Sequence, residues 1–349
     1  MKTIHIEASE PYNVIIGSGI LDKSGEVVSK LLKSKHTVIV SDDNVYPLYG
    51  ERLEKSLTEN GFTFEAFVFP HGEESKSHKT LIELYNFLAE KNISRSDSLI
   101  ALGGGVTGDL TGFAAASFLR GIDYVQIPTS LLAQIDSSVG GKTAVDIAGG
   151  KNLVGAFKQP KVVIADIDTL STLSEDFFAD GMGEAVKYGM IYSRELFDLI
   201  KTGKIKENLE KIIETCVDIK RQVVENDEFD LGLRMILNFG HTLGHSIEKY
   251  YNYNGISHGK AVAVGMYLMT RAAEKSGIIS KPISEELKEC LMVNNLPFET
   301  EVPCKDLFKG AINDKKRFSD NINLIICKEI GKAEIVKMPV SEFEKLICN

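Results

Sequence analysis

The 349-residue sequence lacks several features that would place it in a specialised class of protein. It has no apolar run of about 18 residues, the length that a membrane-spanning helix needs. Its formal net charge of −9 gives no basic excess for nucleic acid, although local charge still allows a small anionic substrate. The N-terminal stretch has no apolar core of the kind that signal peptides carry. We therefore expect a cytoplasmic protein with no membrane partner and no nucleic-acid partner.

Cysteine is also scarce and gives no recognisable framework. The five cysteines are odd in number, scattered and without a Cys-x-x-Cys motif; they are Cys216, Cys290, Cys304, Cys327 and Cys348. We expect free thiols in a reducing compartment and no metal site made from cysteines. The remaining composition, 43% hydrophobic and 26% charged, is that of an ordinary globular protein whose length suits two domains.

Hydrophobic periodicity changes character near residue 170. Before that point short β-type runs alternate with helical stretches, and after it the runs have helical periodicity. Alternating strands and helices predict a parallel sheet covered by helices. The expected fold class is therefore α/β + α, with a Rossmann-like parallel-sheet nucleotide-binding domain over residues 1–170 and an all-helical domain over residues 171–349.

Residues suited to a nucleotide follow expected strands in the first domain. Gly103, Gly105 and Gly108 match Gly-x-Gly-x-x-Gly, a turn that lets backbone amides approach a pyrophosphate at a helix N-terminus. The acidic strand end precedes this loop, whereas the standard fold places it about 20 residues later. That end carries Asp42 and Asn44, which suit either a ribose hydroxyl or simple turn formation.

Two further polar regions lie in the same domain. Glu73 and Lys76 follow the third expected strand, where ligands of open α/β sheets gather. Residues 127–155 are rich in glycine and carry Thr129, Ser130, Asp136, Lys142, Lys151 and Asn152. Lysines beside glycines suit phosphate or carboxylate binding, whereas the composition of this region by itself favours a surface loop.

One expected helix of the second domain, residues 232–246, carries an unusual polar stripe. Arg234, Asn238, His241 and His245 are spaced by four, three and four residues, so they share one helical face. Burying these groups is costly unless they have partners. The stripe is therefore either a functional face or a solvated face with a few core histidines, and this helix alone does not decide between them.

A metal-binding set can be assembled from distant positions. Glu184 and Lys187 lie one turn apart in a helix with few other charges, and His258 stands just before another helix. With His241 they provide one carboxylate and two imidazoles, a set that binds catalytic zinc and leaves a position open. Because the three ligands are not local in sequence, their spacing does not establish the site.

Together these stretches resemble the 3-dehydroquinate synthases, a branch of the sugar-phosphate cyclase family, nearly from end to end. The similarity is carried by "HGEESK", "GGGVTGD", "FLRGIDYVQIPTSLLAQIDSSVGGKTAVD", "GKNLVGAF", "DGMGEAVKYG", "LRMILNFGHTLGH", "SHGKAVAVGM" and "DKK". The resemblance implies an NAD-binding first domain, a helical second domain that binds metal and substrate, one NAD, and one divalent metal, usually zinc with cobalt as an alternative.

The resemblance also implies roles for individual residues. The metal ligands would be Glu184, His241 and His258. The NAD contacts would be Asp42, Asn44, Glu73, Lys76, Gly104, Gly105, Val106, Asp109, Thr129, Ser130, Lys142 and Lys151. The substrate contacts would be Asp136, Lys142, Asn152, Lys187, Lys220, Arg234, Asn238, His245 and one of Lys315 and Lys316. Arg120 would reach the substrate pocket of the partner in a homodimer.

The implied reaction converts 3-deoxy-D-arabino-heptulosonate 7-phosphate to 3-dehydroquinate and phosphate, a lyase step of the shikimate pathway toward chorismate and the aromatic amino acids. It runs through transient oxidation by NAD, β-elimination of phosphate, re-reduction and intramolecular aldol closure. The alternatives are another sugar-phosphate cyclase, a metal-dependent glycerol or alcohol dehydrogenase, and a non-catalytic NAD-binding regulator. Lys220 and Arg234 favour a substrate with a carboxylate, and the basic groups as a whole favour one with phosphate.

Overall fold

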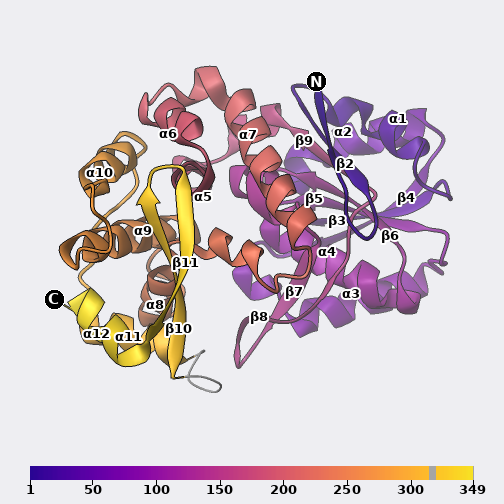
Figure 1. Cartoon of the computed structure of the whole chain (residues 1–349). Helices are drawn as coiled ribbons and strands as arrows, with labels where there is room; N and C mark the ends of the chain where they lie inside the picture. The colour runs from indigo at the N-terminus through magenta and orange to yellow at the C-terminus, as the bar shows by residue number, and fades with distance from the viewer. Residues whose placement is uncertain (314–319, 349) are drawn as a thin grey trace. The chain divides into compact units, whose positions relative to one another are not determined.

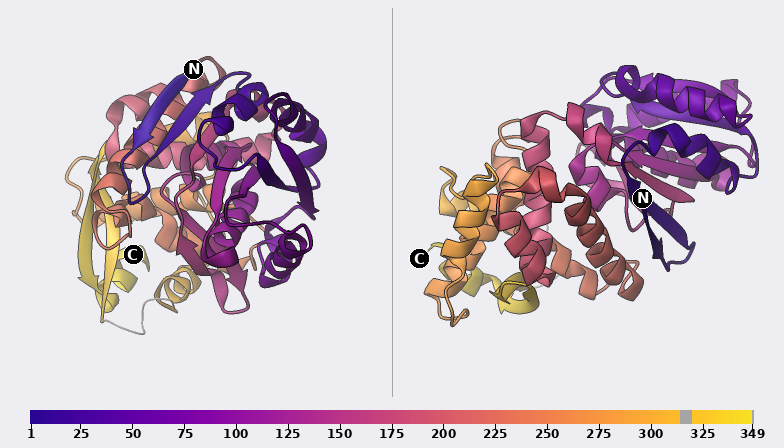
Figure 2. Two further views of the ribbon diagram at one scale, coloured as in Figure 1. Left: turned by 90° about the vertical axis from the view of Figure 1, so that its right-hand side faces the viewer. Right: turned by 90° about the horizontal axis from the view of Figure 1, so that it is seen from above.

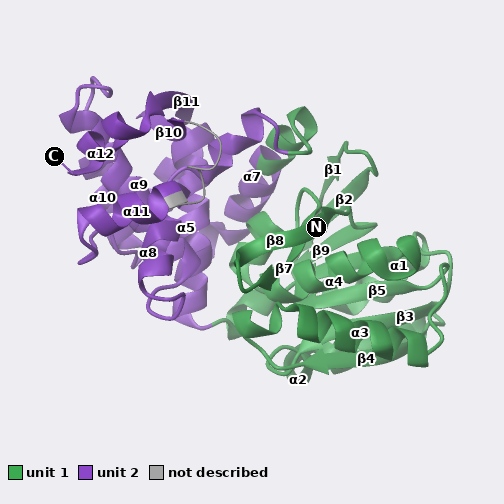
Figure 3. Ribbon diagram, turned by 90° about the horizontal axis from the view of Figure 1, so that it is seen from below, with its two compact units in different colours: residues 1–173, 220–229 green, residues 174–219, 230–349 purple. Residues whose placement is uncertain are grey.

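The structure, a computed structural model, describes residues 1–313 and 320–348. Two compact units make up the chain (Figure 3): unit 1 is Met1–Leu173 with Lys220–Phe229, and unit 2 is Ser174–Ile219 with Asp230–Asn349. Helix α7 (Ile205–Asn226) contributes residues to both units. The functional roles assigned to residues 1–170 and 171–349 stay predictions. Lys315 and Lys316 lie outside the described residues.

Unit 1 is built on a seven-stranded sheet in the order β1-β2-β9-β6-β5-β3-β4 (Figure 1). All neighbouring strands are parallel except β1 and β2, and β1, which starts at the N-terminus, forms the antiparallel edge (Figure 2). The strands are β1 (Lys2–Ile6), β2 (Tyr12–Gly17), β3 (His36–Asp42), β4 (Thr63–Phe69), β5 (Ser98–Gly103), β6 (Asp123–Pro128) and β9 (Val162–Asp166).

Helices cover both faces of this sheet, and therefore its central strands are almost continuously apolar. In β3, Ile39 belongs to the core shared with α1 and α2, whereas Val38 and Val40 belong to the core shared with α3 and α4. The helices are α1 (Ser24–Ser29), α2 (Tyr46–Glu59), α3 (His78–Glu90) and α4 (Gly105–Ser117). The predicted alternation of strand and helix is thus confirmed.

The strand order reverses at β3. The chain runs from β3 outward to its neighbour β4 and then returns to β5 on the other side of β3. Such a switch point leaves a crevice at the carboxyl ends of the strands, where open α/β sheets bind ligands. Asp42 ends β3 and Gly103 ends β5, so both lie at this crevice.

A β-hairpin occupies much of the glycine-rich region that favoured a surface loop. Strands β7 (Lys142–Ile147) and β8 (Gly150–Phe157) pair antiparallel, and β7 packs against α4. The packing depends on Gly112 of α4, where an added Cβ would lie 2.3 Å from Cγ2 of Thr143. The loop interpretation is wrong for residues 142–157, because a partner far away in sequence orders them.

Unit 2 is mainly helical. Its helices besides α7 are α5 (Glu175–Tyr192), α6 (Arg194–Lys201), α8 (His241–Tyr250), α9 (His258–Lys275), α10 (Ser284–Val293), α11 (Cys304–Asn313) and α12 (Val340–Cys348). The predicted fold class, an α/β domain followed by a helical domain, is confirmed. No helix in residues 1–313 and 320–348 combines the length and apolarity needed to cross a membrane.

The expectation of an all-helical second domain needs one correction. An antiparallel hairpin, β10 (Asn321–Glu329) with β11 (Lys332–Pro339), follows α11. Ile322, Leu324 and Ile326 alternate along β10 and are buried in the same core as residues of α8, α9, α11 and α12. A helical core can bury such a strand because its two-residue period gives one continuous apolar face.

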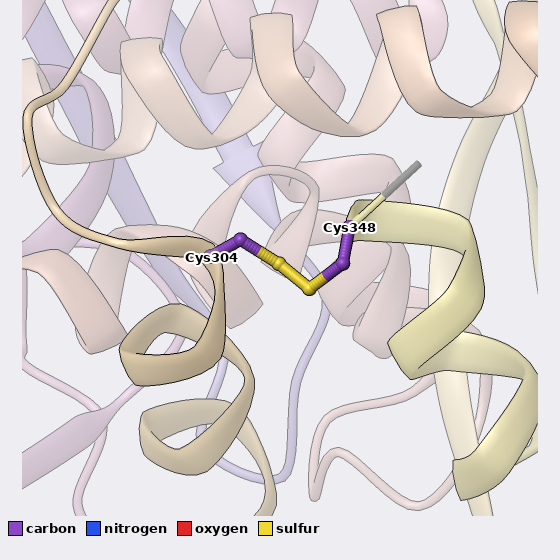
Figure 4. The surroundings of a disulfide bond; sticks show 2 residues. All are labelled: Cys304 and Cys348. Carbon is purple, nitrogen blue, oxygen red and sulfur yellow. A yellow bond between two sulfur atoms is a disulfide. The ribbon is translucent and has the colours of Figure 1, made fainter.

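A second correction concerns the cysteines. Cys304 and Cys348 form a disulfide between the start of α11 and the end of α12, with their Cα atoms 5.6 Å apart (Figure 4). The two helices pack together, so 44 residues of separation do not keep the sulfurs apart. The expectation of free thiols is wrong for this pair, whereas Cys290 and Cys327 are buried thiols.

Candidate functional site

Three side chains from three helices of unit 2 converge on one point. Glu184 of α5 is fully buried, and its Oε1 lies 3.6 Å from Nε2 of His241 and 3.6 Å from Nε2 of His258. His241 is the first residue of α8 and His258 the first residue of α9. The structure thus brings together the three residues that were grouped from their chemistry and from the family resemblance.

The other nitrogen of each ring is already engaged. His241 Nδ1 lies 3.1 Å from the carbonyl oxygen of Phe239, and His258 Nδ1 lies 3.3 Å from Oε2 of Glu248. A neutral ring that donates its Nδ1–H to such an acceptor leaves the Nε2 lone pair for a metal. Both rings therefore direct a ligand atom toward Oε1 of Glu184.

The spacing of these atoms fits a tetrahedral ion. Ligand atoms bound at about 2.0–2.2 Å to a tetrahedral zinc lie about 3.3–3.6 Å from one another. The two nitrogen–oxygen separations of 3.6 Å agree with this, and all three ligand atoms lie within 4.8 Å of each other. Two histidines and one glutamate leave a fourth position for water or substrate.

Local charge and burial shift the pKa values of the two imidazoles in opposite directions. Burial lowers the pKa of His241 well below its usual value, and the nearby Lys187, His258 and His245 lower it further, so His241 is neutral as a ligand must be. Burial also acts to lower the pKa of His258, but the hydrogen bond and charge of Glu248, with Glu184, raise it to about 9. Lys187 Nζ binds Oε2 of Glu184, which orients the carboxylate.

Glycines allow the helices to approach closely enough. A Cβ on Gly259, next to His258, would lie 1.9 Å from the carbonyl oxygen of Asp180 in α5. A Cβ on Gly183, next to Glu184, would lie 2.3 Å from the carbonyl oxygen of Gly259. The backbones of α5 and α9 are therefore in contact where the ligands lie, and Gly259 N donates a hydrogen bond to Oδ1 of Asp180.

The predicted helix over residues 232–246 is not one helix. A 3₁₀ segment spans Leu233–Asn238, and the chain then breaks at Gly240, whose φ is +79°. A Cβ at Gly240 would lie 2.6 Å from the carbonyl oxygen of Val262 and 2.5 Å from Cγ of Met266, both in α9. The break lets α8 start at His241, and the single-face interpretation of the polar stripe is wrong.

Some of the implied substrate contacts of unit 2 lie beside Glu184, His241 and His258, which we call the metal-type centre. The His245 ring centroid lies 5.4 Å from that of His241 and 5.8 Å from that of His258, and Lys187 binds Glu184. Arg234 is buried and Asn238 exposed, and both lie in the 3₁₀ segment, which contacts α5, β10 and β11.

In unit 1 the glycine motif lies at the switch point. A Cβ on Gly103 would lie 2.4 Å from Oγ1 of Thr107, and one on Gly108 would lie 2.7 Å from Oε1 of Gln126, so α4 packs tightly on the sheet. Gly104 and Gly105 lead into the N-terminus of α4, followed by Val106. Such a helix start presents backbone N–H groups to an anion.

Asp42 has a clear local role at this edge. Its Oδ1 accepts hydrogen bonds from the backbone N–H groups of Asn44 and Val45 at 3.0 and 2.9 Å. Its Oδ2 lies 3.3 Å from Oγ1 of Thr107 in α4, and Thr129 N donates to the carbonyl of Gly103. Asp42 therefore stabilises a turn, as the simpler of its two interpretations predicted. Its contact with a ribose hydroxyl stays a prediction.

Lys76 is buried and lies at the centre of a polar cluster. Its Nζ lies 2.5 Å from Oδ2 of Asp109 and 2.5 Å from Oδ1 of Asn152. Burial acts to lower the pKa of Lys76, but the charges of Asp109 and Glu73 outweigh it and raise the pKa. Asp146 joins the cluster through two backbone N–H bonds, accepting from Asn152 N at 2.7 Å and donating from its own N to Lys76 O.

Other implied residues of unit 1 meet in pairs. Lys151 Nζ lies 3.5 Å from Oε1 of Glu73, and the buried Lys220 donates from Nζ to Asp136. Lys142 is exposed at the start of β7, and Ser130 begins the segment that leads to Asp136. Lys220 belongs to the stretch of residues 220–229 that is part of unit 1, as is Asp136.

Arg120 stands apart from these groups. It is exposed, with φ of +67°, in the turn that precedes β6, whereas Thr129 follows the carboxyl end of β6. A six-residue strand is about 20 Å long, so Arg120 lies near the amino ends of the strands and Thr129 near their carboxyl ends.

Sequence reasoning missed three acidic residues of these clusters, Asp146, Asp180 and Glu248. Glu248 follows His241 by seven residues, a spacing that puts both on one face of a helix and could have identified it. Asp180 precedes Glu184 by four residues and could have been found in the same way. Asp146 gives no such signal, because the β7–β8 hairpin itself was not predicted.

The fold resembles those of a solved sugar-phosphate cyclase and of a glycerol dehydrogenase. A solved structure of 2-deoxy-scyllo-inosose synthase, complexed with carbaglucose-6-phosphate, NAD+ and Co2+, superposes with a TM-score of 0.88 and 25% identity, covering 99% of both chains. Glycerol dehydrogenase from Schizosaccharomyces pombe superposes with a TM-score of 0.66 and 15% identity, covering 96% of this chain and 87% of that one. The second likeness is one of fold alone.

The sequence comparison is more specific. Residues 66–180 match the family model of the 3-dehydroquinate synthase N-terminal part, and residues 181–317 match the C-terminal part. The 3-dehydroquinate synthase of Clostridium botulinum (strain Alaska E43 / Type E3) is 46% identical over 99% of this chain and 100% of its own. The chain belongs to the 3-dehydroquinate synthase family.

Proposed function

We propose that the protein converts 3-deoxy-D-arabino-heptulosonate 7-phosphate to 3-dehydroquinate and inorganic phosphate. The observation that carries this proposal is the buried cluster of Glu184, His241 and His258, whose spacing suits a catalytic metal, in a chain of this family. In the proposed reaction, a metal held at this centre would polarise the oxygen of the alcohol that NAD oxidises before phosphate leaves.

The cofactors of the proposal are NAD and one divalent metal, zinc or cobalt. When bound, NAD reversibly accepts a hydride and the metal polarises an alcohol or ketone oxygen. Glu184, His241 and His258 would hold the metal, and the start of α4 with the carboxyl ends of β3, β5 and β6 would hold NAD. Support comes from the solved 2-deoxy-scyllo-inosose synthase, a complex with NAD+ and Co2+.

The remaining residues of the proposal bind and orient the substrate. Lys187 neutralises Glu184 and stays close enough to donate to a substrate oxygen beside the metal position. His245, whose ring lies next to both metal-type histidines, is suited to bind the phosphate or carry a proton. Lys142, Lys220 and Arg234 supply positive charge for the phosphate and the carboxylate.

The proposal includes a homodimer in which Arg120 completes the partner's substrate site. Arg120 is exposed and precedes β6, whereas the candidate NAD contacts lie at the carboxyl ends of the strands. Leu119 and Arg120 both have left-handed φ values, 51° and 67°, and such strained turns are frequent at functional positions. The proposed compartment is the cytoplasm, which rests on the sequence expectation alone.

The decisive experiment offers the purified protein three substrates with NAD and zinc. Phosphate and 3-dehydroquinate should form from the heptulosonate phosphate, and neither glucose 6-phosphate nor glycerol should react. Chelation of the metal should stop the reaction, and zinc or cobalt should restore it. Oxidation of glycerol with steady formation of NADH, or turnover of the hexose phosphate alone, would contradict the proposal.

A further inference from the structure

We propose that Glu248 is a positioning residue for His258, and that its carboxylate sets how tightly the centre binds a metal. The proposal rests on the metal-binding part of the function proposed above. Glu248 does not point at the metal position itself; it contacts the far side of a ligand ring. Its effect would therefore pass through His258.

The contact geometry determines the orientation of the ring. Glu248 is 4% exposed, and its Oε2 lies 3.3 Å from Nδ1 of His258. The opposite nitrogen, Nε2, lies 3.6 Å from Oε1 of Glu184. Because an imidazole is rigid and planar, an acceptor that binds Nδ1–H also determines where the Nε2 lone pair points.

Helix α8 brings this carboxylate to the start of α9. Glu248 follows His241 by seven residues and His245 by three, so the three side chains lie on one face of α8. The two helices approach closely at Gly244, where a Cβ would lie 3.2 Å from the backbone of Ala261. A buried glutamate on this face therefore meets the first residue of α9.

The two histidines have different partners. His241 donates to a neutral backbone carbonyl, that of Phe239, whereas His258 contacts a charged carboxylate. A carboxylate partner makes a ligating imidazole more basic, and loss of such a partner weakens metal binding about 10–100-fold. Of the two histidines, His258 is thus the one whose strength as a ligand a substitution of its partner side chain can change.

An alternative role for Glu248 is direct ligation of a second metal ion. His245, Glu248 and His258 also place one ligand atom each within 4.8 Å of one another. A metal there would take Nδ1 of His258, the nitrogen that faces Glu248. The number of ions bound per chain therefore distinguishes a positioning role from ligation by Glu248.

The test measures Co2+ binding to the full chain without substrate or NAD. Competition with a chelator gives the affinity, titration gives the stoichiometry, and the visible spectrum of bound Co2+ reports its geometry. The variants are Glu248→Gln, which keeps an acceptor but loses the charge, and Glu248→Leu, which loses both. Glu285→Gln, an exposed carboxylate of α10, is the matched control for charge alone.

We expect one Co2+ per chain, an affinity about 10–100-fold lower in Glu248→Leu with a changed spectrum, a smaller loss in Glu248→Gln, and no change in Glu285→Gln. If the leucine variant does not fold, the loss of affinity in the glutamine variant decides.

Unchanged affinity and spectrum in the glutamine and leucine variants would overturn the inference while leaving the metal site intact. Two ions in the native chain and one in Glu248→Gln would overturn it in favour of ligation. A native chain that binds no Co2+ would overturn both this inference and the metal-binding part of the proposed function.

Discussion

At the scale of single residues, Glu184 has two tasks. Its Oε1 faces the two imidazoles, and its Oε2 binds Lys187. Glu184 and Lys187 are at most 1% exposed, so neither charge is hydrated. The attraction between the two charges has to compensate for the lost hydration. Breaking such a pair is far more costly than removing it, because an uncompensated charge stays buried.

Glu184→Gln should therefore lower the free energy of unfolding of the metal-free protein by about 3–5 kcal/mol. The double variant Glu184→Gln/Lys187→Met should recover most of this loss, because no buried charge remains. Urea denaturation with a chelator present measures both values. The control Glu26→Gln breaks an exposed pair with Lys30 and should have no measurable effect. A single variant as stable as the native protein would show that the pair is not a buried ion pair.

At the scale of elements, the metal-type centre depends on the close approach of α5, α8 and α9. Glycines at the contacts let backbone meet backbone, as at Gly259 and the carbonyl oxygen of Asp180. Any side chain there has to separate two helices that each carry a ligand. The requirement is steric, so it holds with or without metal.

Gly259→Ala should lower the free energy of unfolding by about 1–3 kcal/mol or more and weaken zinc binding, because the methyl group forces α9 away from α5. Thermal and urea denaturation measure the first effect, and chelator competition the second. The matched control is Gly149→Ala, whose Cβ would have no atom nearer than 3.7 Å. Equal stability of the two variants would contradict the packing account.

The same elements show how far sequence reasoning reaches. The sequence predicted strands β3 and β5 and the glycine turn correctly, because an apolar run bounded by turn residues is a local property. The break at Gly240 did not, because a glycine inside a helical pattern is often tolerated. What ends the helix there is contact with Val262 and Met266, more than 20 residues further on.

The candidate site divides in the same way. Glu184, His241 and His258 were identified as one set from their chemistry and from the resemblance, and the structure brings them together. Their partners Asp180 and Glu248 were missed, because an acidic residue in a helix is usually a solvated one. Packing alone decides that these two are buried.

At the scale of the whole molecule, the proposal makes each active site depend on two chains. A two-fold dimer would place Arg120 of one protomer in the site of the other and the reverse. Arg120 and Lys142 belong to unit 1, so they can be altered separately without touching the metal-type centre.

Mixing two inactive variants tests this dependence. Arg120→Ala and Lys142→Ala should each lose activity, and a mixed dimer should contain one site with both residues intact. Random exchange makes about half of the dimers mixed, so about a quarter of all sites should recover. Size-exclusion chromatography of differently tagged chains checks that subunits exchange. No recovery despite exchange would show that Arg120 acts in its own protomer.

One measurement tests directly whether NAD is reduced and reoxidised within one turnover. Phosphate release and absorbance of NADH are followed together in one reaction with the heptulosonate phosphate and NAD present in less than stoichiometric amount. We expect many equivalents of phosphate per NAD with no accumulation of NADH. Phosphate release that stops after one equivalent of NAD, or NADH that rises in proportion to product, would contradict it.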